Sequence, residues 1–150
     1  MPIQYRTGNM LDCQADYLVN PVNCAGVMGK GLALQFAQRF PEILPRYRTA
    51  CEKRTLRPGT VQIAYARWSA TKIVNFPTKD DWRAPSRLEW ISAGLDTLAH
   101  ELGPNNPRSI AFPPLGCGLG GLDWDQVRPL IEAFAAHVPH MRVFIFGTEA

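Results

Sequence analysis

The chain has 150 residues, of which 46% are hydrophobic, and a formal net charge of +3. This length is enough to bury the core of one ordinary domain without disulfides or a metal. No run approaches the ~18 to 20 apolar residues that a membrane helix requires, and the N-terminus lacks a secretory signal pattern. We therefore expect one cytoplasmic domain over residues 1–150, with no membrane partner. The mild basicity is compatible with a polyanionic partner but does not require one.

Six short apolar or alternating runs, each bounded by polar or turn residues, predict six strands. They are Ile3–Arg6, Tyr17–Val22, Val61–Ala66, Lys72–Phe76, Ser109–Phe112 and Arg142–Phe146. Helical patterns alternate with them at Gly31–Phe40, Arg87–Leu102 and Trp124–Ala136. Ser86 and Asp123 are the expected N-caps of the second and third helices. This alternation predicts an α/β domain with helices on both faces of one sheet.

Basic residues gather shortly after the first predicted helix. They are Arg46, Arg48, Lys53, Arg54 and Arg57. Two interpretations are open, a solvated helix face or a contact for a polyanion, and the solvated face is favoured because surface charges usually have that role.

The cysteines and histidines do not predict a metal centre. The four cysteines are widely spaced and form no Cys-x-x-Cys pair, which disfavours a zinc cage and a disulfide scaffold. His137 and His140 flank a proline and lack a third ligand, so a polar surface loop is favoured there. We expect reduced thiols, no metal and no cofactor.

Two glycine-rich loops each follow a predicted strand and precede a predicted helix. The first contains Asn23 and runs to Gly31, with three glycines in six residues, and the second is Pro113 to Gly121. Glycine lets the backbone approach a ligand closely, and a helix N-terminus favours negative charge, so such loops suit phosphate. Neither a Gly-x-Gly-x-x-Gly nor a Walker pattern is present in the first loop, which disfavours a nucleoside triphosphatase. Because ligands bind beyond the carboxyl ends of parallel strands, both loops are expected to face one ligand.

The pair of loops resembles the macrodomain family. The family pattern Asn-x-x-Asn…Gly-x-Gly is matched by Asn20, Asn23, Gly29 and Gly31, and its diphosphate loop by Gly116-Cys117-Gly118. The resemblance implies a three-layer α/β/α sandwich with a mixed, roughly six-stranded sheet, and ADP-ribose as ligand. It places the distal ribose at Asn23 and the diphosphate at the second loop. The residues that it implies for ADP-ribose binding are Gly8, Asn9, Asn20, Asn23, Gly29, Lys30, Gly31, Leu115, Gly116, Cys117, Gly118, Leu119, Gly120 and Phe146.

The adenine end of this predicted site departs from the family. Macrodomains commonly carry Gly-Asp-Ile or Gly-Asp-Leu near the N-terminus, whereas this chain reads Gly8-Asn9-Met10. Asn9 is still able to accept a hydrogen bond from the adenine amine, without the assistance of a full charge. Phe146 lies where many macrodomains offer a ring to adenine, and its alternative role is a core residue of the last strand, on the same face as Phe144.

Lys79 is the expected catalytic residue. Taken alone, a lysine among polar residues is usually a solvated surface charge. The chain is similar, however, to the branch of the family that contains terminal ADP-ribose protein glycohydrolase and the DarG antitoxins, which use a lysine in an equivalent Thr-Lys segment. The resemblance implies removal of ADP-ribose from thymine in single-stranded DNA. Lys79 then serves either as an ammonium that assists the leaving group or as an amine nucleophile.

One departure concerns a second catalytic group. Terminal ADP-ribose protein glycohydrolase has an acid in its glycine loop where this chain has Gly120. Asp80 and Asp81 are weak candidates to replace it, and otherwise Lys79 acts largely alone. The absence of the acid favours DNA over protein as the substrate.

Further partners follow from the same resemblance. Trp82, Arg83 and Arg87 are expected to contact ADP-ribosylated single-stranded DNA, whereas Trp90 is more simply a core residue. A DarT-type toxin is the expected partner through a region outside this chain, and residues 1–150 are then the N-terminal domain of a longer antitoxin. Alternatives are an ADP-ribosyl-protein hydrolase acting on glutamate or aspartate esters, a non-catalytic reader of ADP-ribose, and a module that binds another nucleotide.

Overall fold

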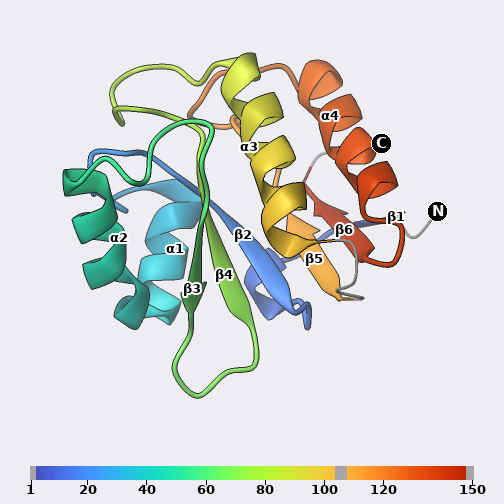
Figure 1. The fold of residues 1–150 in the computed structure, drawn as a ribbon, viewed down its shortest axis with the longest axis horizontal. Coiled ribbons are helices and arrows are strands. Elements are labelled where there is room, and N and C mark those ends of the chain that lie inside the picture. The colour runs from blue at the N-terminus through green and yellow to red at the C-terminus, as the bar shows by residue number, and fades with distance from the viewer. Residues whose placement is uncertain (1–2, 104–107, 148–150) are drawn as a thin grey trace.

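The computed structural model describes residues 3–103 and 108–147. Within them, six strands form one sheet in the order β1-β6-β5-β2-β4-β3 (Figure 1). The neighbouring pairs are parallel except that β3, at one edge, runs antiparallel to β4. The strands are β1 (Ile3–Arg6), β2 (Tyr17–Val22), β3 (Gln62–Tyr65), β4 (Lys72–Pro77), β5 (Ser109–Phe112) and β6 (Arg142–Phe146). This is the mixed six-stranded sheet expected from the sequence.

Helices cover both faces of this sheet, which confirms the three predicted layers. The helices α1 (Gly31–Arg39) and α2 (Leu44–Glu52) pack on one face, and α3 (Leu88–Leu102) and α4 (Trp124–His137) pack on the other (Figure 1). Two single-turn helices, η1 (Met10–Asp12) and η2 (Pro41–Ile43), complete the described elements. None of the helices in the described ranges is long and apolar enough to cross a membrane.

Alternation along the strands divides the core into two halves. Val19 of β2 faces α3 and α4, whereas its neighbour Leu18 faces α1 and α2. At the end of β6, Phe144 and Phe146 share the α1 and α2 side, as the period of two predicts. The helix α3 lies so close to β4 that a side-chain carbon at Gly94 would come within 2.5 Å of the Phe76 ring.

The structure corrects one predicted helix cap and confirms another. Asp123 caps α4 by accepting a hydrogen bond from the Asp125 N–H. Ser86 does not cap α3, because that helix begins one residue later than predicted, and its N-cap, Arg87, makes no side-chain capping bond. Instead Ser86 is buried, and its N–H donates to the carbonyl of Gly120 at 3.0 Å.

The helix α2 was not among the predicted elements. It is nine residues long, has Pro45 in its first turn, and buries only Tyr47 and Cys51. So short and polar a segment shows little periodicity. The basic residues predicted to form a solvated face do lie on α2 and the turn after it, and all of them are exposed. They are Arg46, Arg48, Lys53, Arg54 and Arg57.

Candidate functional site

The carboxyl ends of β5, β2 and β4 meet at one edge of the sheet, because these neighbouring strands are parallel. The loops that follow them, residues 23–30, 78–87 and 113–123, surround a cavity of about 730 Å³. Pockets for small molecules typically measure about 300 to 1,000 Å³. The lining residues are Pro21, Val22, Asn23, Val27, Gly29, Lys30, Gly31, Leu32, Ala33, Thr78, Lys79, Trp82, Arg83, Pro113, Pro114, Gly116, Gly118, Leu119 and Gly120.

Most of the predicted site residues line this cavity. The two glycine loops and the Lys79 segment, far apart in sequence, face each other across it. The other lining residues were not predicted individually, and they lie within or next to the predicted segments. The only sequence feature that indicated them was therefore the position of those loops. Within the described ranges, the predicted residues that do not line it are Gly8, Asn9, Asn20, Arg87, Leu115, Cys117 and Phe146.

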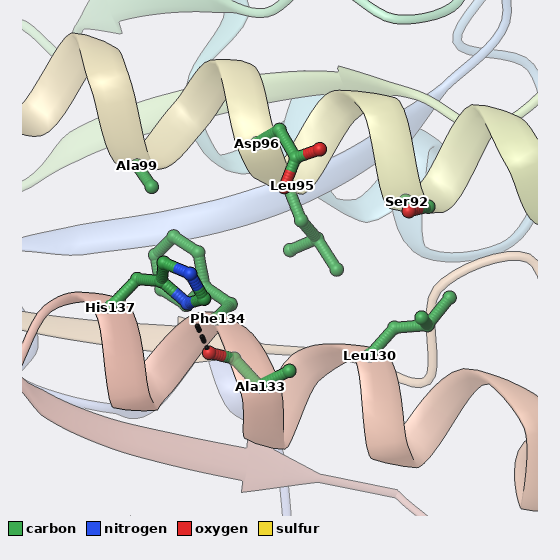
Figure 2. Close-up of a pocket in the computed structure, with 8 residues that line it drawn as sticks. All are labelled: Ser92, Leu95, Asp96, Ala99, Leu130, Ala133, Phe134 and His137. Atoms are coloured by element: carbon green, nitrogen blue, oxygen red, sulfur yellow. Dashed lines mark hydrogen bonds between the residues drawn. The ribbon is translucent and has the colours of Figure 1, made fainter.

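A second, smaller hollow of about 160 Å³ lies between α3 and α4, away from the strand ends (Figure 2). Its walls are mainly apolar and include Leu95 and Phe134. The Nδ1 of His137 lies 2.9 Å from the carbonyl oxygen of Ala133, within hydrogen-bond distance (Figure 2). Its small volume and few free polar groups make it a poor ligand site compared with the larger cavity.

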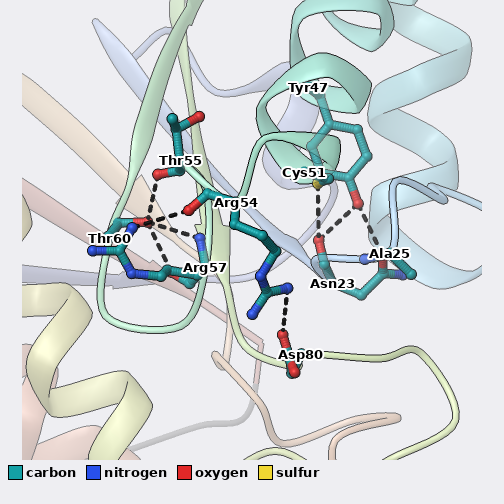
Figure 3. A network of polar contacts seen from close by, with 9 residues as sticks. All are labelled: Asn23, Ala25, Tyr47, Cys51, Arg54, Thr55, Arg57, Thr60 and Asp80. Carbon is teal, nitrogen blue, oxygen red and sulfur yellow. Dashed lines mark hydrogen bonds and ion pairs between the residues drawn. The ribbon is translucent and has the colours of Figure 1, made fainter.

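Asn23 is held in a network of hydrogen bonds at the mouth of the first glycine loop (Figure 3). Its Oδ1 accepts from the Ala25 N–H at 3.0 Å, and its Nδ2 donates to the Val27 carbonyl at 2.7 Å. The hydroxyl of Tyr47, from α2, donates to the Asn23 carbonyl at 2.8 Å. The carboxamide therefore has a defined direction before any ligand binds.

Lys79 reaches the same cavity from the loop after β4. The backbone pairing of β2 and β4 continues past both strands, with Thr78 N–H donating to Val22 at 2.8 Å and Cys24 N–H to the Asp80 carbonyl at 3.0 Å. These bonds tie the Lys79 loop to the Asn23 loop. The Lys79 Nζ donates to the carbonyl of Trp82 at 3.2 Å. An amine is thus held beside the ligand space by main-chain contacts.

Asp80 and Asp81, the weak candidates for a second catalytic group, lie outside the cavity lining. Asp80 pairs with Arg54 at 2.9 Å, and Asp81 pairs with Arg83 at 3.1 Å. The hydrogen bond from Arg83 lowers the pKa of the Asp81 carboxyl below its ordinary value. Both carboxylates are therefore paired with arginine. The cavity lining includes three cations, Lys30, Lys79 and Arg83, and no acidic side chain among the described residues. Such a surface suits a diphosphate.

The second glycine loop has no room for a side chain at Gly120. A carbon added there would lie 2.2 Å from the Ser86 Oγ and 2.4 Å from the Gly116 carbonyl oxygen. Gly116 itself has a φ of +73°, which glycine adopts without strain. An acid therefore cannot occupy position 120 while Ser86 and the loop keep these places.

The predicted adenine contacts are not among the residues that line the described cavity. Asn9 uses its Oδ1 to accept from the Leu11 N–H at 3.0 Å, capping η1. Phe146 is 6% exposed and packs in the core on the α1 and α2 side, which supports the alternative role given above. The adenine roles of Gly8, Asn9 and Phe146 stay predictions.

Asn20 connects strands below the pocket instead of facing it. It is fully buried, and its Nδ2 donates to the Asn75 Oδ1 at 3.1 Å, while Asn75 in turn donates to Gln62 at 3.0 Å. These amides join β2, β4 and β3. Asn20 therefore supports the loop that follows β2. Leu115, also fully buried, packs in the core on the α3 and α4 side and so fixes the second loop, to which it belongs.

The four cysteines are free thiols, and the described ranges contain no group of three or more side chains suited to a metal ion. Burial raises the pKa of the Cys24 thiol from its ordinary 9.0 to about 12 and that of Cys117 to about 11. At neutral pH both thiols are therefore protonated, which disfavours a nucleophilic role for the cysteine in the second glycine loop.

These buried thiols predict a loss of stability in alkali. Because the pKa of the Cys24 thiol is higher in the folded protein than in the unfolded chain, the protonated thiol contributes to the free energy of unfolding. This contribution is fully present below pH 9.0 and is lost as the pH rises toward about 12. We expect the melting temperature to fall above about pH 9, and to fall less steeply in Cys24→Ala. Calorimetry over this range checks the prediction, and equal slopes for the two proteins would contradict it.

Comparison with known proteins agrees with this geometry. The macro domain family profile matches residues 19–131. A DNA ADP-ribosyl glycohydrolase of Mycobacterium tuberculosis is 42% identical over 146 residues, covering 96% of this chain and 42% of that protein. The solved macrodomain of Mycobacterium tuberculosis DarG superposes with a TM-score of 0.92 at 39% identity, covering 98% of both chains. Thermosipho africanus DarTG, solved in complex with ADP-ribose, has a TM-score of 0.86 at 31% identity, covering 95% of this chain and 41% of that one.

The three layers, the two glycine loops and the family match together define the class: the chain belongs to the macrodomain family. Among the relatives compared, it is similar over nearly its whole length to the macrodomain of DarG. The chain spans less than half the length of the curated DNA ADP-ribosyl glycohydrolases that it matches.

Proposed function

We propose that this chain binds ADP-ribose and removes it from thymine bases of single-stranded DNA, counteracting a DarT-type transferase. The observation that carries the proposal is the position of Lys79, which shares one cavity with Asn23 and both glycine loops. Support comes from the relatives named DNA ADP-ribosyl glycohydrolase, at 40% to 42% identity.

In this proposal the ligand lies along the strand ends. The backbone N–H groups of the lining residues Gly116, Gly118, Leu119 and Gly120 hold the diphosphate, whereas the Cys117 N–H is used by the Pro114 carbonyl at 3.0 Å. Lys30 adds a positive charge. Asn23 and the Gly29 to Gly31 segment hold the distal ribose, which places its anomeric carbon toward Lys79. Adenine lies toward the N-terminal segment, with Asn9 and Phe146 as its expected partners.

The reaction breaks the bond between the anomeric carbon of the distal ribose and a thymine nitrogen. The base leaves with the electron pair and takes a proton, and water supplies the hydroxyl that remains on ADP-ribose. As an ammonium, Lys79 stabilises or protonates the leaving base. As a neutral amine, it attacks the anomeric carbon first, and water then releases the covalent intermediate.

The shape of the second loop favours DNA over protein esters as the substrate. An enzyme that needs a carboxylate at position 120 requires space that Ser86 and Gly116 occupy here. Lys79 thus acts without an acid in that loop.

The test uses two substrates of matched ligand content, a single-stranded oligonucleotide carrying ADP-ribose on thymine and a protein carrying it on glutamate. Release from the oligonucleotide, followed by gel shift and mass spectrometry, is the expected result. Release of ADP-ribose from the modified protein but not from the oligonucleotide would show instead that the chain is an ADP-ribosyl-protein ester hydrolase. Binding of free ADP-ribose without release from either substrate would indicate a reader.

Trp82 and Arg83 are the proposed contacts for the DNA strand. Trp82 is 47% exposed at the cavity, and the Arg83 guanidinium lies 5.2 Å from its ring. Aromatic stacking and a nearby cation suit an unpaired base and its phosphate. Arg87 lies at the start of α3 beside Trp90, outside the cavity lining, and extends this surface.

Replacing Arg83 by glutamine should weaken binding of the modified oligonucleotide and lower its salt dependence by about 0.7 in log–log slope, the value of one phosphate contact on a single strand. Affinity for free ADP-ribose should fall less than affinity for the modified oligonucleotide. Arg39→Gln is the matched control, because Arg39 is an exposed arginine paired with Asp12 away from the cavity. An unchanged salt slope in Arg83→Gln would contradict a phosphate contact.

We further propose a cytoplasmic setting, where a DNA substrate and a DarT-type toxin are both present. The greater length of the curated relatives supports the view that residues 1–150 are one domain of a longer antitoxin. Co-purification of the toxin with a longer protein, but not with residues 1–150 alone, would be the expected outcome.

A further inference from the structure

Tyr47 connects the helix layer to the ligand-facing end of β2. Its side chain on α2 is fully buried. The hydroxyl donates to the Asn23 carbonyl at 2.8 Å and lies 3.0 Å from the Asn23 Oδ1, so one donor serves both oxygens (Figure 3). Tyr47 is not part of the cavity lining, whereas Asn23 is. Any effect of Tyr47 on a ligand is therefore indirect, and Asn23 is the lining residue to which its hydroxyl donates.

The contacts around Asn23 assign the direction of its carboxamide. Oδ1 faces three donors, the Tyr47 hydroxyl at 3.0 Å, the Ala25 N–H at 3.0 Å and the Val27 N–H at 3.4 Å. Nδ2 faces an acceptor, the Val27 carbonyl at 2.7 Å. A reversed amide would direct its NH2 group at these donors and its oxygen at the carbonyl, so one orientation is strongly preferred. With one Nδ2 hydrogen used by Val27, the second remains for a ligand oxygen.

The Tyr47 hydroxyl is suited to be a permanent hydrogen-bond donor to Asn23. Burial raises the pKa of this phenol well above its ordinary value, so it keeps its proton at all physiological pH values. The other group near the Asn23 carbonyl is the Cys51 thiol at 4.0 Å. A thiol is a weak donor and does not replace a phenol.

We propose that Tyr47 is a positioning residue, which orients the Asn23 carboxamide toward the distal ribose of ADP-ribose. The inference rests on the proposed function, because it needs ADP-ribose in the cavity. A fixed carboxamide binds without the loss of side-chain freedom that a mobile one incurs. Without the phenol, Asn23 keeps its loop contacts, and the donor that remains from outside its own loop among the described contacts is the weak Cys51 thiol at 4.0 Å.

The test compares ADP-ribose with ADP, which lacks the distal ribose, by titration calorimetry. In Tyr47→Phe, which keeps the buried volume, we expect the Kd for ADP-ribose to rise about 3- to 10-fold, the value of one hydrogen bond. The Kd for ADP should change less than about twofold. Tyr5→Phe is the matched control, since this substitution also removes a hydrogen-bonded hydroxyl. The Tyr5 hydroxyl contacts Glu132 and Arg128, and none of these three residues lines the cavity.

A double variant separates positioning from general support. If Tyr47 acts through the Asn23 side chain, Tyr47→Phe should weaken ADP-ribose binding less in an Asn23→Ala background than in the wild type. Equal weakening of ADP and ADP-ribose, full additivity, or no effect of Tyr47→Phe would each overturn the inference. Failure of the wild type to bind ADP-ribose would instead overturn the proposed function. Melting temperatures show that each variant is folded.

Discussion

Lys79→Ala should abolish release of ADP-ribose from modified single-stranded DNA, with a fall of at least about 10²- to 10³-fold in rate. The reason is that, among the described residues, the lining contains no acid and only two other cations, Lys30 and Arg83. Of the three cations, Lys79 is the one proposed to lie beside the anomeric carbon, and its ammonium is held there by the Trp82 carbonyl. Affinity for free ADP-ribose should change little, because the glycine loops and Asn23 remain. Single-turnover release and calorimetry measure the two quantities.

Two further variants make this result specific. Lys53→Ala is the matched control, because Lys53 is an exposed lysine on the turn after α2, outside the cavity lining. Lys79→Arg keeps the positive charge but removes the nucleophilic amine. Substantial activity in Lys79→Arg would favour the ammonium role, and complete loss together with a covalent adduct trapped by reductant in the wild type would favour the nucleophile. Full activity in Lys79→Ala would contradict both roles.

Gly120→Ala should damage both the loop and the ligand site. Its new carbon would approach the Gly116 carbonyl oxygen at 2.4 Å and the Ser86 Oγ at 2.2 Å, and the first contact involves backbone that cannot rotate away. Overpacking of this kind costs about 1 to 3 kcal/mol, or about 2 to 12 °C in melting temperature for a domain of this size. Because the displaced loop is the proposed diphosphate cradle, affinity for ADP-ribose should fall at least about 10-fold.

Gly118→Ala provides the control for stability within the same loop. A carbon added at Gly118 meets no described atom within 4 Å, so the melting temperature should stay close to that of the wild type. Ser86→Gly in the Gly120→Ala background should restore only part of the stability, because the clash with Gly116 remains. A wild-type melting temperature for Gly120→Ala would show that the loop adapts without cost.

Most of the architecture was predictable because local patterns and fold agree. The strands β1, β2, β5 and β6 were predicted with the bounds observed, β4 and three helices differ by one residue at one end, and β3 is shorter by one residue at each end. The α3 face Ile91, Leu95 and Leu98 is buried as its spacing predicts. The helix α2 was not predicted, because so few buried residues over nine positions leave no periodic signal.

The candidate site was predictable where it consists of loops at strand ends. Parallel strands bring Asn23, Lys79 and Gly116 to one edge whatever the details of packing, so the sequence order and the two glycine loops were sufficient to bring them together. The roles of individual side chains were less predictable. Asn20, in the same motif as Asn23, is fully buried and bonded to Asn75 instead of facing the cavity.

The sequence by itself determined the α/β class, the position of the site at the strand ends, and the chemical groups available there, because periodicity and glycine placement are local properties of the chain. Only the tertiary structure decided that Ser86 closes the space at Gly120 and that Tyr47 orients Asn23. The first contact joins residues that are 34 positions apart in the sequence, and the second joins residues that are 24 positions apart. Such contacts depend on how helices and loops pack against the sheet, and that packing leaves no pattern in the sequence around either residue.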